Sequence, residues 1–85
     1  MKPRVLLGRI SNGAVRNVRF RDLVRLTEAF GFRLSRTQGS HHVFAQPEIL
    51  ELLNLQDVGG EAKPYQIRQL LLLVERYNLQ LRDEP

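Results

Sequence analysis

The chain has 85 residues and a mass of 9.9 kDa, with 42% hydrophobic residues, 26% charged residues and no cysteine. This length supports one small core and no second domain, and the lack of cysteine excludes disulfides and thiolate zinc sites. The net charge of +4 favours anionic partners, nucleic acid first among them, although small domains commonly carry about 2 to 8 charges for solubility alone. The longest apolar run, residues 70–74, is far shorter than the roughly 20 residues of a membrane span. We therefore expect a soluble, cytoplasmic protein.

The first half of the chain predicts an N-terminal arm followed by one amphipathic helix. Residues 1–19 form the arm, in which apolar residues between Val5 and Ile10 fit a short helix that Gly8 weakens. From Phe20 onward, apolar residues recur at i, i+3, i+4, i+7 and i+10, which is the spacing of one helix face. Gly31 suits the left-handed residue that follows a helix, so this helix should end at Phe30.

Two short strands joined by a tight turn should follow this helix. Residues 32–37 alternate with period two and residues 41–45 form a second apolar run, while Gly39 and Ser40 supply the turn between them. If Phe32 and Leu34 point toward the helices, Arg33, Ser35 and Thr37 point to the open face, and Arg36 points inward. These two runs predict an antiparallel hairpin.

The last part of the chain predicts a third strand and a closing helix. Residues 52–58 alternate around Leu53 and Leu55, and Gly59-Gly60 ends the run. Pro64 suits the first position of a helix because its missing N–H is not needed there. The expected buried stripe of that helix comprises Ile67, Leu70, Leu71 and Val74. The fold class is then α+β, an α-β-β-β-α order with two helices on one face of a three-stranded antiparallel sheet.

The two adjacent histidines are the candidate chemical groups. Counting back by twos from the inward Phe44 places His42 on the covered face and His41 on the open face near the turn. Histidine can give or take a proton near neutral pH without a metal, which suits the cleavage of RNA through its 2′-hydroxyl. Adjacent histidines on a strand face opposite ways, so we expect no metal site and no cofactor. A pair of polar residues at a strand edge without chemical function fits the same pattern.

At this point the sequence resembles the HicA toxins of bacterial toxin–antitoxin pairs. The resemblance is carried by residues 23–32, by residues 36–44 with their Gly-Ser-His turn, and by the basic entry to the last helix at residues 63–70. It implies a double-stranded-RNA-binding-like fold over residues 20–79, followed by a tail at residues 80–85. It also implies an mRNA-cleaving endoribonuclease whose essential histidine corresponds to His41, and a HicB-type antitoxin as partner. Many members carry histidine or basic residues near the third strand, where this chain has Asn54 and Gln56.

Three functions remain open from the sequence: a metal-independent endoribonuclease toxin, a non-catalytic RNA-binding module, and a protein whose open sheet face docks a partner. For the first, His41 is the expected general acid/base. Phosphate contacts that do not read bases are expected from Arg33, Arg36 and Lys63. The remaining residues of the expected RNA-binding set are Gly39, Ser40 and His42.

Overall fold

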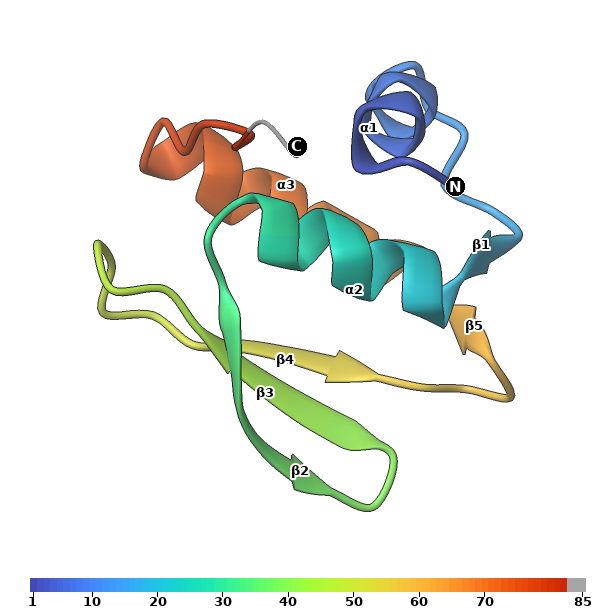
Figure 1. Cartoon of the computed structure of the whole chain (residues 1–85). Coiled ribbons are helices and arrows are strands. Elements are labelled where there is room, and N and C mark those ends of the chain that lie inside the picture. Colours follow the sequence, from blue (N-terminus) through green and yellow to red (C-terminus); the bar gives the residue numbers. More distant parts are fainter. Residues whose placement is uncertain (83–85) are drawn as a thin grey trace.

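The computed structural model describes residues 1–82 and contains two small antiparallel sheets and three helices. In chain order the elements are α1 (Pro3–Ser11), β1 (Val18–Arg19), α2 (Phe20–Ala29), β2 (Arg33–Gln38), β3 (His41–Ala45), β4 (Leu53–Gln56), β5 (Glu61–Ala62) and α3 (Pro64–Arg76). The larger sheet has the order β2-β3-β4, with α2 and α3 on one of its faces (Figure 1). The predicted α+β, double-stranded-RNA-binding-like class is therefore confirmed. The two-stranded sheet of β1 and β5 was not predicted.

Helix α2 follows the apolar spacing of its sequence. Its side chains Phe20, Leu23 and Leu26 are buried in the apolar cluster that also contains residues of the larger sheet and of α3. Phe30 caps its C-terminus, and Gly31 follows with a φ of +93°, a conformation that residues with a Cβ rarely adopt. The predicted helix end is therefore confirmed. A Cβ at Gly31 would also lie 2.8 Å from the Arg82 guanidinium.

Helix α3 begins at Pro64 as predicted, but its buried stripe is rotated slightly from the expected one. Ile67 and Leu70 are fully buried, and the next buried position is Leu73. Leu71 and Val74, which the prediction placed in the stripe, are only partly buried at its flank. Toward its C-terminus the helix buries every third residue, so the buried stripe passes through Ile67, Leu70 and Leu73.

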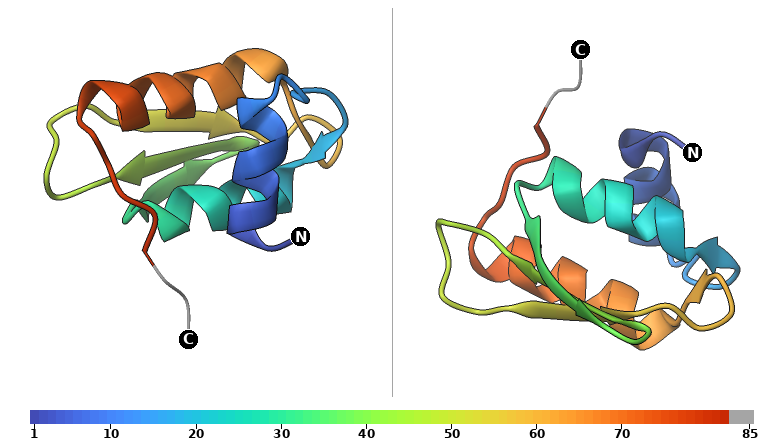
Figure 2. Two further views of the ribbon diagram at one scale, coloured as in Figure 1. Left: turned by 90° about the horizontal axis from the view of Figure 1, so that it is seen from above. Right: turned by 60° about the horizontal axis from the view of Figure 1, so that its bottom comes forward.

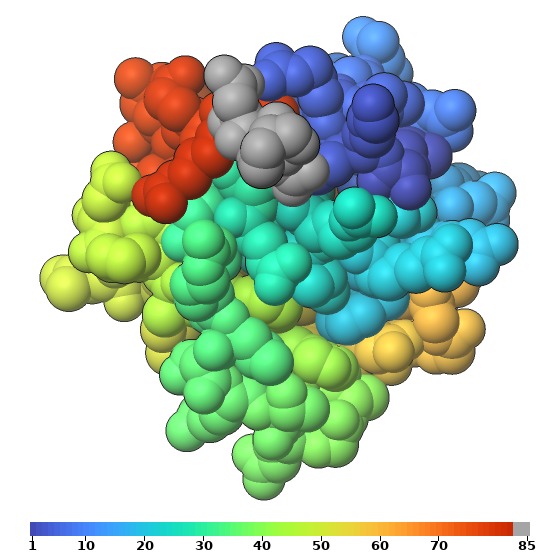
Figure 3. All heavy atoms as spheres, viewed as in Figure 1, coloured from blue at the N-terminus to red at the C-terminus, as the bar shows by residue number. Residues whose placement is uncertain are grey.

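Strand β2 departs most from its predicted alternation. The register shifts between Leu34 and Arg36, so Ser35 forms a β-bulge. As a result Arg36 lies opposite Val43 and Gln38 lies opposite His41, and the predicted inward orientation of Arg36 is wrong. Leu34 was expected to pack under the helices but is 50% exposed, since the β2–β3 hairpin projects beyond the helix layer (Figure 3).

Both ends of the described chain pack against α2. Helix α1 lies beside α2 and contributes Leu6 and Ile10 to the common core (Figure 2). At the other end Leu79 is buried, and the Arg82 amide donates a hydrogen bond of 2.8 Å to the Ala29 carbonyl. The expected tail at residues 80–85 thus lies within the described residues only as far as residue 82.

Candidate active site on the open face of the sheet

The turn before His41 is fixed by backbone geometry and by the neighbouring strand. Gly39 has a φ of +60° in a two-residue turn between Gln38 and His41, which suits the first central position of a tight hairpin turn. The Ser40 carbonyl accepts a hydrogen bond of 2.9 Å from the Asp57 amide, and the Ser40 hydroxyl lies 3.4 Å from the Gln56 amide nitrogen. The turn is therefore tied to the end of β4.

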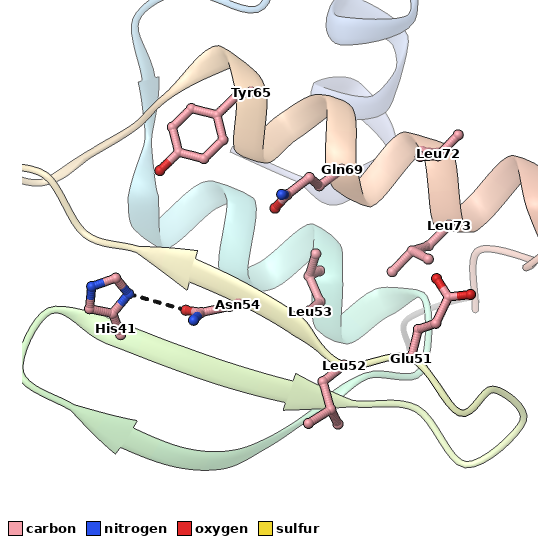
Figure 4. A pocket seen from close by; sticks show the side chains of 9 residues that line it. All are labelled: His41, Glu51, Leu52, Leu53, Asn54, Tyr65, Gln69, Leu72 and Leu73. Carbon is pink, nitrogen blue, oxygen red and sulfur yellow. Dashed lines mark hydrogen bonds between the residues drawn. The ribbon is translucent and has the colours of Figure 1, made fainter.

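His41 lies exposed on the open face with one ring nitrogen engaged. Its Nδ1 is 3.3 Å from Oδ1 of Asn54, which comes from the adjacent strand β4 (Figure 4). An amide oxygen can only accept, so this contact requires the proton on Nδ1 and leaves the lone pair of a neutral imidazole on Nε2. The arrangement fits a general base whose tautomer is set by a neighbouring side chain.

The bulge in β2 turns Arg36 to the side of the sheet on which Arg33 also lies. Residues paired directly across an antiparallel ladder point to the same side of the sheet, so Arg33 shares a side with Ala45 and Arg36 shares a side with Val43 and His41. Arg33 also donates from Nη1 to the Phe32 carbonyl at 2.8 Å and to the Glu28 carbonyl at 3.2 Å, which holds it at the end of α2. No hydrogen bond or ion pair involves the Arg36 guanidinium within residues 1–82, which leaves its donors free for a phosphate.

His42 occupies a different environment from His41. It is partly buried with its ring 5.0 Å from that of Phe20, and its Nδ1 lies 3.1 Å from the Ser40 carbonyl. The two histidine side chains thus point to opposite faces and do not form a pair. The separation follows from the alternation of β3.

A groove runs between the edge strand β4 and helix α3, with His41 at one end (Figure 4). It has a volume of about 400 Å³ and is lined by His41, Glu51, Leu52, Leu53, Asn54, Tyr65, Gln69, Leu72 and Leu73. Lys63, the remaining expected phosphate contact, is exposed at the N-terminus of α3, two residues before Tyr65.

The opposite end of the groove carries an exposed polar cluster. The Tyr77 hydroxyl donates a hydrogen bond to the Glu51 carboxylate, and Arg76 contacts the same carboxylate at 3.1 Å. The Tyr77 hydrogen bond, followed by Arg76, lowers the pKa of Glu51 from its ordinary value. The same hydrogen bond raises the pKa of Tyr77. Glu51 therefore stays ionised near neutral pH.

The sequence did not identify two residues, Asn54 and Gln66, as part of the site. Asn54 was noted only as a departure from the family pattern, although its position opposite Val43 places it diagonally beside His41. Gln66 is fully buried and donates from Nε2 to the Gln56 carbonyl at 3.0 Å, while its own Oε1 has no partner within the described residues. A glutamine on the buried face of an otherwise apolar helix stripe is the signal that could have revealed it.

Residues 1–82, which the structure describes, contain no group of three His, Asp or Glu side chains placed to hold a metal ion. None of the helices in residues 1–82 has the length and apolar character needed to cross a membrane.

The fold and the exposed histidine define a small α+β protein whose open sheet face carries His41 and Arg36. The family model described as the HicA toxin of bacterial toxin–antitoxin matches residues 20–74, which is well over half of the chain. The chain therefore belongs to the HicA toxin family, and it is a toxin that pairs with an antitoxin. No curated protein and no solved structure matches the chain significantly.

Proposed function

We propose that this protein is a metal-independent endoribonuclease that cleaves mRNA in the cytoplasm, with His41 as its general acid/base and a HicB-type antitoxin as its inhibitor. The single observation that carries the proposal is the exposed His41 ring held by Asn54 on the face that also bears Arg36. A proton acceptor and a free cation on one open surface are the groups that phosphodiester cleavage by a 2′-hydroxyl requires.

In the proposed reaction, Nε2 of His41 removes the proton of the 2′-hydroxyl, whose oxygen then attacks the adjacent phosphorus. The O2′–P bond forms, the P–O5′ bond breaks, and the leaving 5′-oxygen takes a proton from water, which reaches the open face. Arg36 stabilises the negative charge that accumulates on the phosphate, and Arg33, farther along β2, contacts the RNA backbone away from the reacting group. The products are a 2′,3′-cyclic phosphate and a 5′-hydroxyl.

The other expected contacts have supporting roles in this proposal. Lys63 attracts the RNA backbone at the N-terminus of α3. Gly39 and Ser40 fix the turn that carries His41, and the Gln66 hydrogen bond holds the backbone of Gln56, the residue opposite His41 in the ladder. We assign His42 to the stability of the turn, since its ring packs on Phe20.

The test compares RNA cleavage by the wild type, His41→Ala and Asn54→Leu in the presence of EDTA. His41→Ala should slow cleavage by about 10²–10⁴-fold, the usual contribution of a general acid/base. Asn54→Leu removes one exposed hydrogen bond worth about 0.5–1.5 kcal/mol, which corresponds to a loss of roughly 2- to 12-fold. A deoxynucleotide on the 5′ side of the scissile bond should block cleavage. Full cleavage by His41→Ala would refute the assignment.

A wild-type protein that binds RNA without cutting it would support the non-catalytic RNA-binding alternative. Growth arrest and mRNA loss on expression of the wild type, but not of His41→Ala, would connect the chemistry to toxicity in cells. Loss of cleavage in EDTA would show that the reaction needs a metal and would contradict the proposal.

A further inference from the structure

Tyr65 is an exposed aromatic residue that the proposed reaction does not use. Its side chain is 52% exposed in the first turn of α3 and lines the same groove as His41 (Figure 4). The buried Gln66 amide donates from Nε2 to the Tyr65 hydroxyl at 3.4 Å and to the Gln56 carbonyl at 3.0 Å. Gln56 pairs with His41 in the ladder of β3 and β4. These contacts link Tyr65 to the end of the groove where His41 lies.

The cations expected to bind phosphate lie outside this groove. Arg36 and Lys63 are absent from its lining, and His41 is the only basic side chain that lines it within residues 1–82. The one carboxylate among these lining residues, Glu51, lies at the opposite end, where its ionised form repels phosphate (Figure 4). An RNA backbone should therefore follow the cations outside the groove, and the groove itself suits an uncharged group.

The wall that α3 contributes to the groove fits one unpaired nucleobase. Tyr65, Gln69 and Leu72 are spaced at i, i+4 and i+7 and so share one face of the helix. Tyr65 offers an aromatic surface for stacking, Leu72 offers an apolar contact, and the exposed Gln69 amide can both donate to and accept from the edge of a base. The groove volume of about 400 Å³ is near the lower end of small-ligand pockets, about 300–1,000 Å³, and gives room for a single base.

We propose that Tyr65 stacks on one unpaired base next to the phosphate at His41, and that this contact restricts the substrate to single-stranded RNA. The inference rests on the proposed function and deepens it by naming the class of RNA. In a duplex both faces of each base are covered by its neighbours, so no base is available to Tyr65. Stacking on an aromatic ring tolerates all bases, so Tyr65 selects for strandedness and not for sequence.

A fluorescent reporter at the stacking position provides the first test. The chain has no tryptophan, so Tyr65→Trp introduces a single one. In a His41→Ala background, which keeps the RNA intact, a short oligouridine should quench this fluorescence, while a blunt duplex RNA of the same length should not. The matched control is Tyr77→Trp, since Tyr77 is the other tyrosine and lies outside the groove lining. Oligouridine should leave the emission of this control unchanged.

The affinity for a labelled oligouridine, measured by fluorescence anisotropy, separates stacking from simple apolar contact. Tyr65→Ala and Tyr65→Leu should each weaken binding by about 5- to 150-fold, the usual loss when the aromatic partner of one base is removed. Tyr65→Phe keeps the ring and loses only the long contact with Gln66, so its affinity should stay within about threefold of the wild type. An abasic ribose–phosphate chain of the same length should bind the wild type and these variants equally, because it has the charge without the bases.

Unchanged oligouridine affinity in Tyr65→Ala, with thermal melting showing that the variant is folded, would overturn the proposal. Equal quenching by duplex and single-stranded RNA, or an equal loss of affinity for the abasic chain, would also overturn it. Because these measurements need no cleavage, they separate this inference from the ribonuclease assignment. Cleavage by the wild type with normal RNA binding by Tyr65→Ala would refute only the stacking, whereas quenching without cleavage by the wild type would refute only the ribonuclease.

Discussion

Substitutions at His42 distinguish a structural role from a catalytic role most clearly, because its ring lies on the inner side of the turn. His42→Ala removes the tilted contact with Phe20, at 5.0 Å between ring centroids, and the 3.1 Å hydrogen bond to the Ser40 carbonyl. An aromatic pair contributes about 0.5–1.5 kcal/mol and a hydrogen bond another 0.5–1.5 kcal/mol or so. The free energy of unfolding should therefore fall by about 1–3 kcal/mol.

For a domain of this size each kcal/mol lowers the Tm by about 4–8 °C, so the loss in His42→Ala should be plain in thermal melting followed by circular dichroism. His42→Phe keeps the ring contact and loses only the hydrogen bond, so it should lie between the wild type and His42→Ala. His41→Ala should melt within a few degrees of the wild type, since its ring is exposed. RNA cleavage well below the melting range should be mildly slowed by His42→Ala and strongly slowed by His41→Ala. Equal melting of the wild type and His42→Ala would refute the reasoning.

Three further results are expected. Phe44→Ala removes a ring from the centre of the core and should lower the free energy of unfolding by about 3–5 kcal/mol in chemical denaturation; wild-type stability would contradict the register of β3. Arg36→Ala should flatten the dependence of log RNA affinity on log salt by roughly 0.7 for single-stranded RNA, whereas Arg9→Ala on α1 should not, and equal slopes would count against a phosphate contact. Tyr77→Phe should raise the pKa of Glu51 toward its ordinary value, as measured by NMR of the carboxyl carbon. Because the pKa of Glu51 is lowered in the folded protein, the contact stabilises the fold above the unfolded pKa, and this stabilisation is lost as the pH falls. An unchanged pKa of Glu51 in Tyr77→Phe would contradict the hydrogen bond.

The elements that depend on local patterns could be predicted from the sequence. Helix α2 with its end at Phe30, strand β3 and the start of α3 at Pro64 follow from apolar spacing, from the φ that only Gly31 adopts easily, and from the missing N–H of proline. The exposure of His41 followed from the alternation of a strand that contains no irregularity.

The features that depend on distant contacts could not be predicted in this way. The bulge at Ser35 has no local signal, because nothing in residues 32–37 interrupts their alternation, and it moved Arg36 to the face of His41. Asn54 becomes a neighbour of His41 only through the register of β3 and β4. The pairing of β1 with β5 joins segments about forty residues apart, each only two residues long, which is too short for a periodic pattern.

The packing of α1 and of residues 79–82 against α2 bears on how much of this toxin behaves as a transferable module. The family match spans residues 20–74, yet Leu6, Ile10 and Leu79 belong to the same apolar cluster as Leu23. A fragment cut at the family boundaries would retain every proposed catalytic group and expose the side of α2 that these three residues cover. The segment that the family model matches is thus shorter than the segment that contributes to the common core. Exchanges between family members made at those boundaries would transfer the chemistry without the side chains that shield it from aggregation.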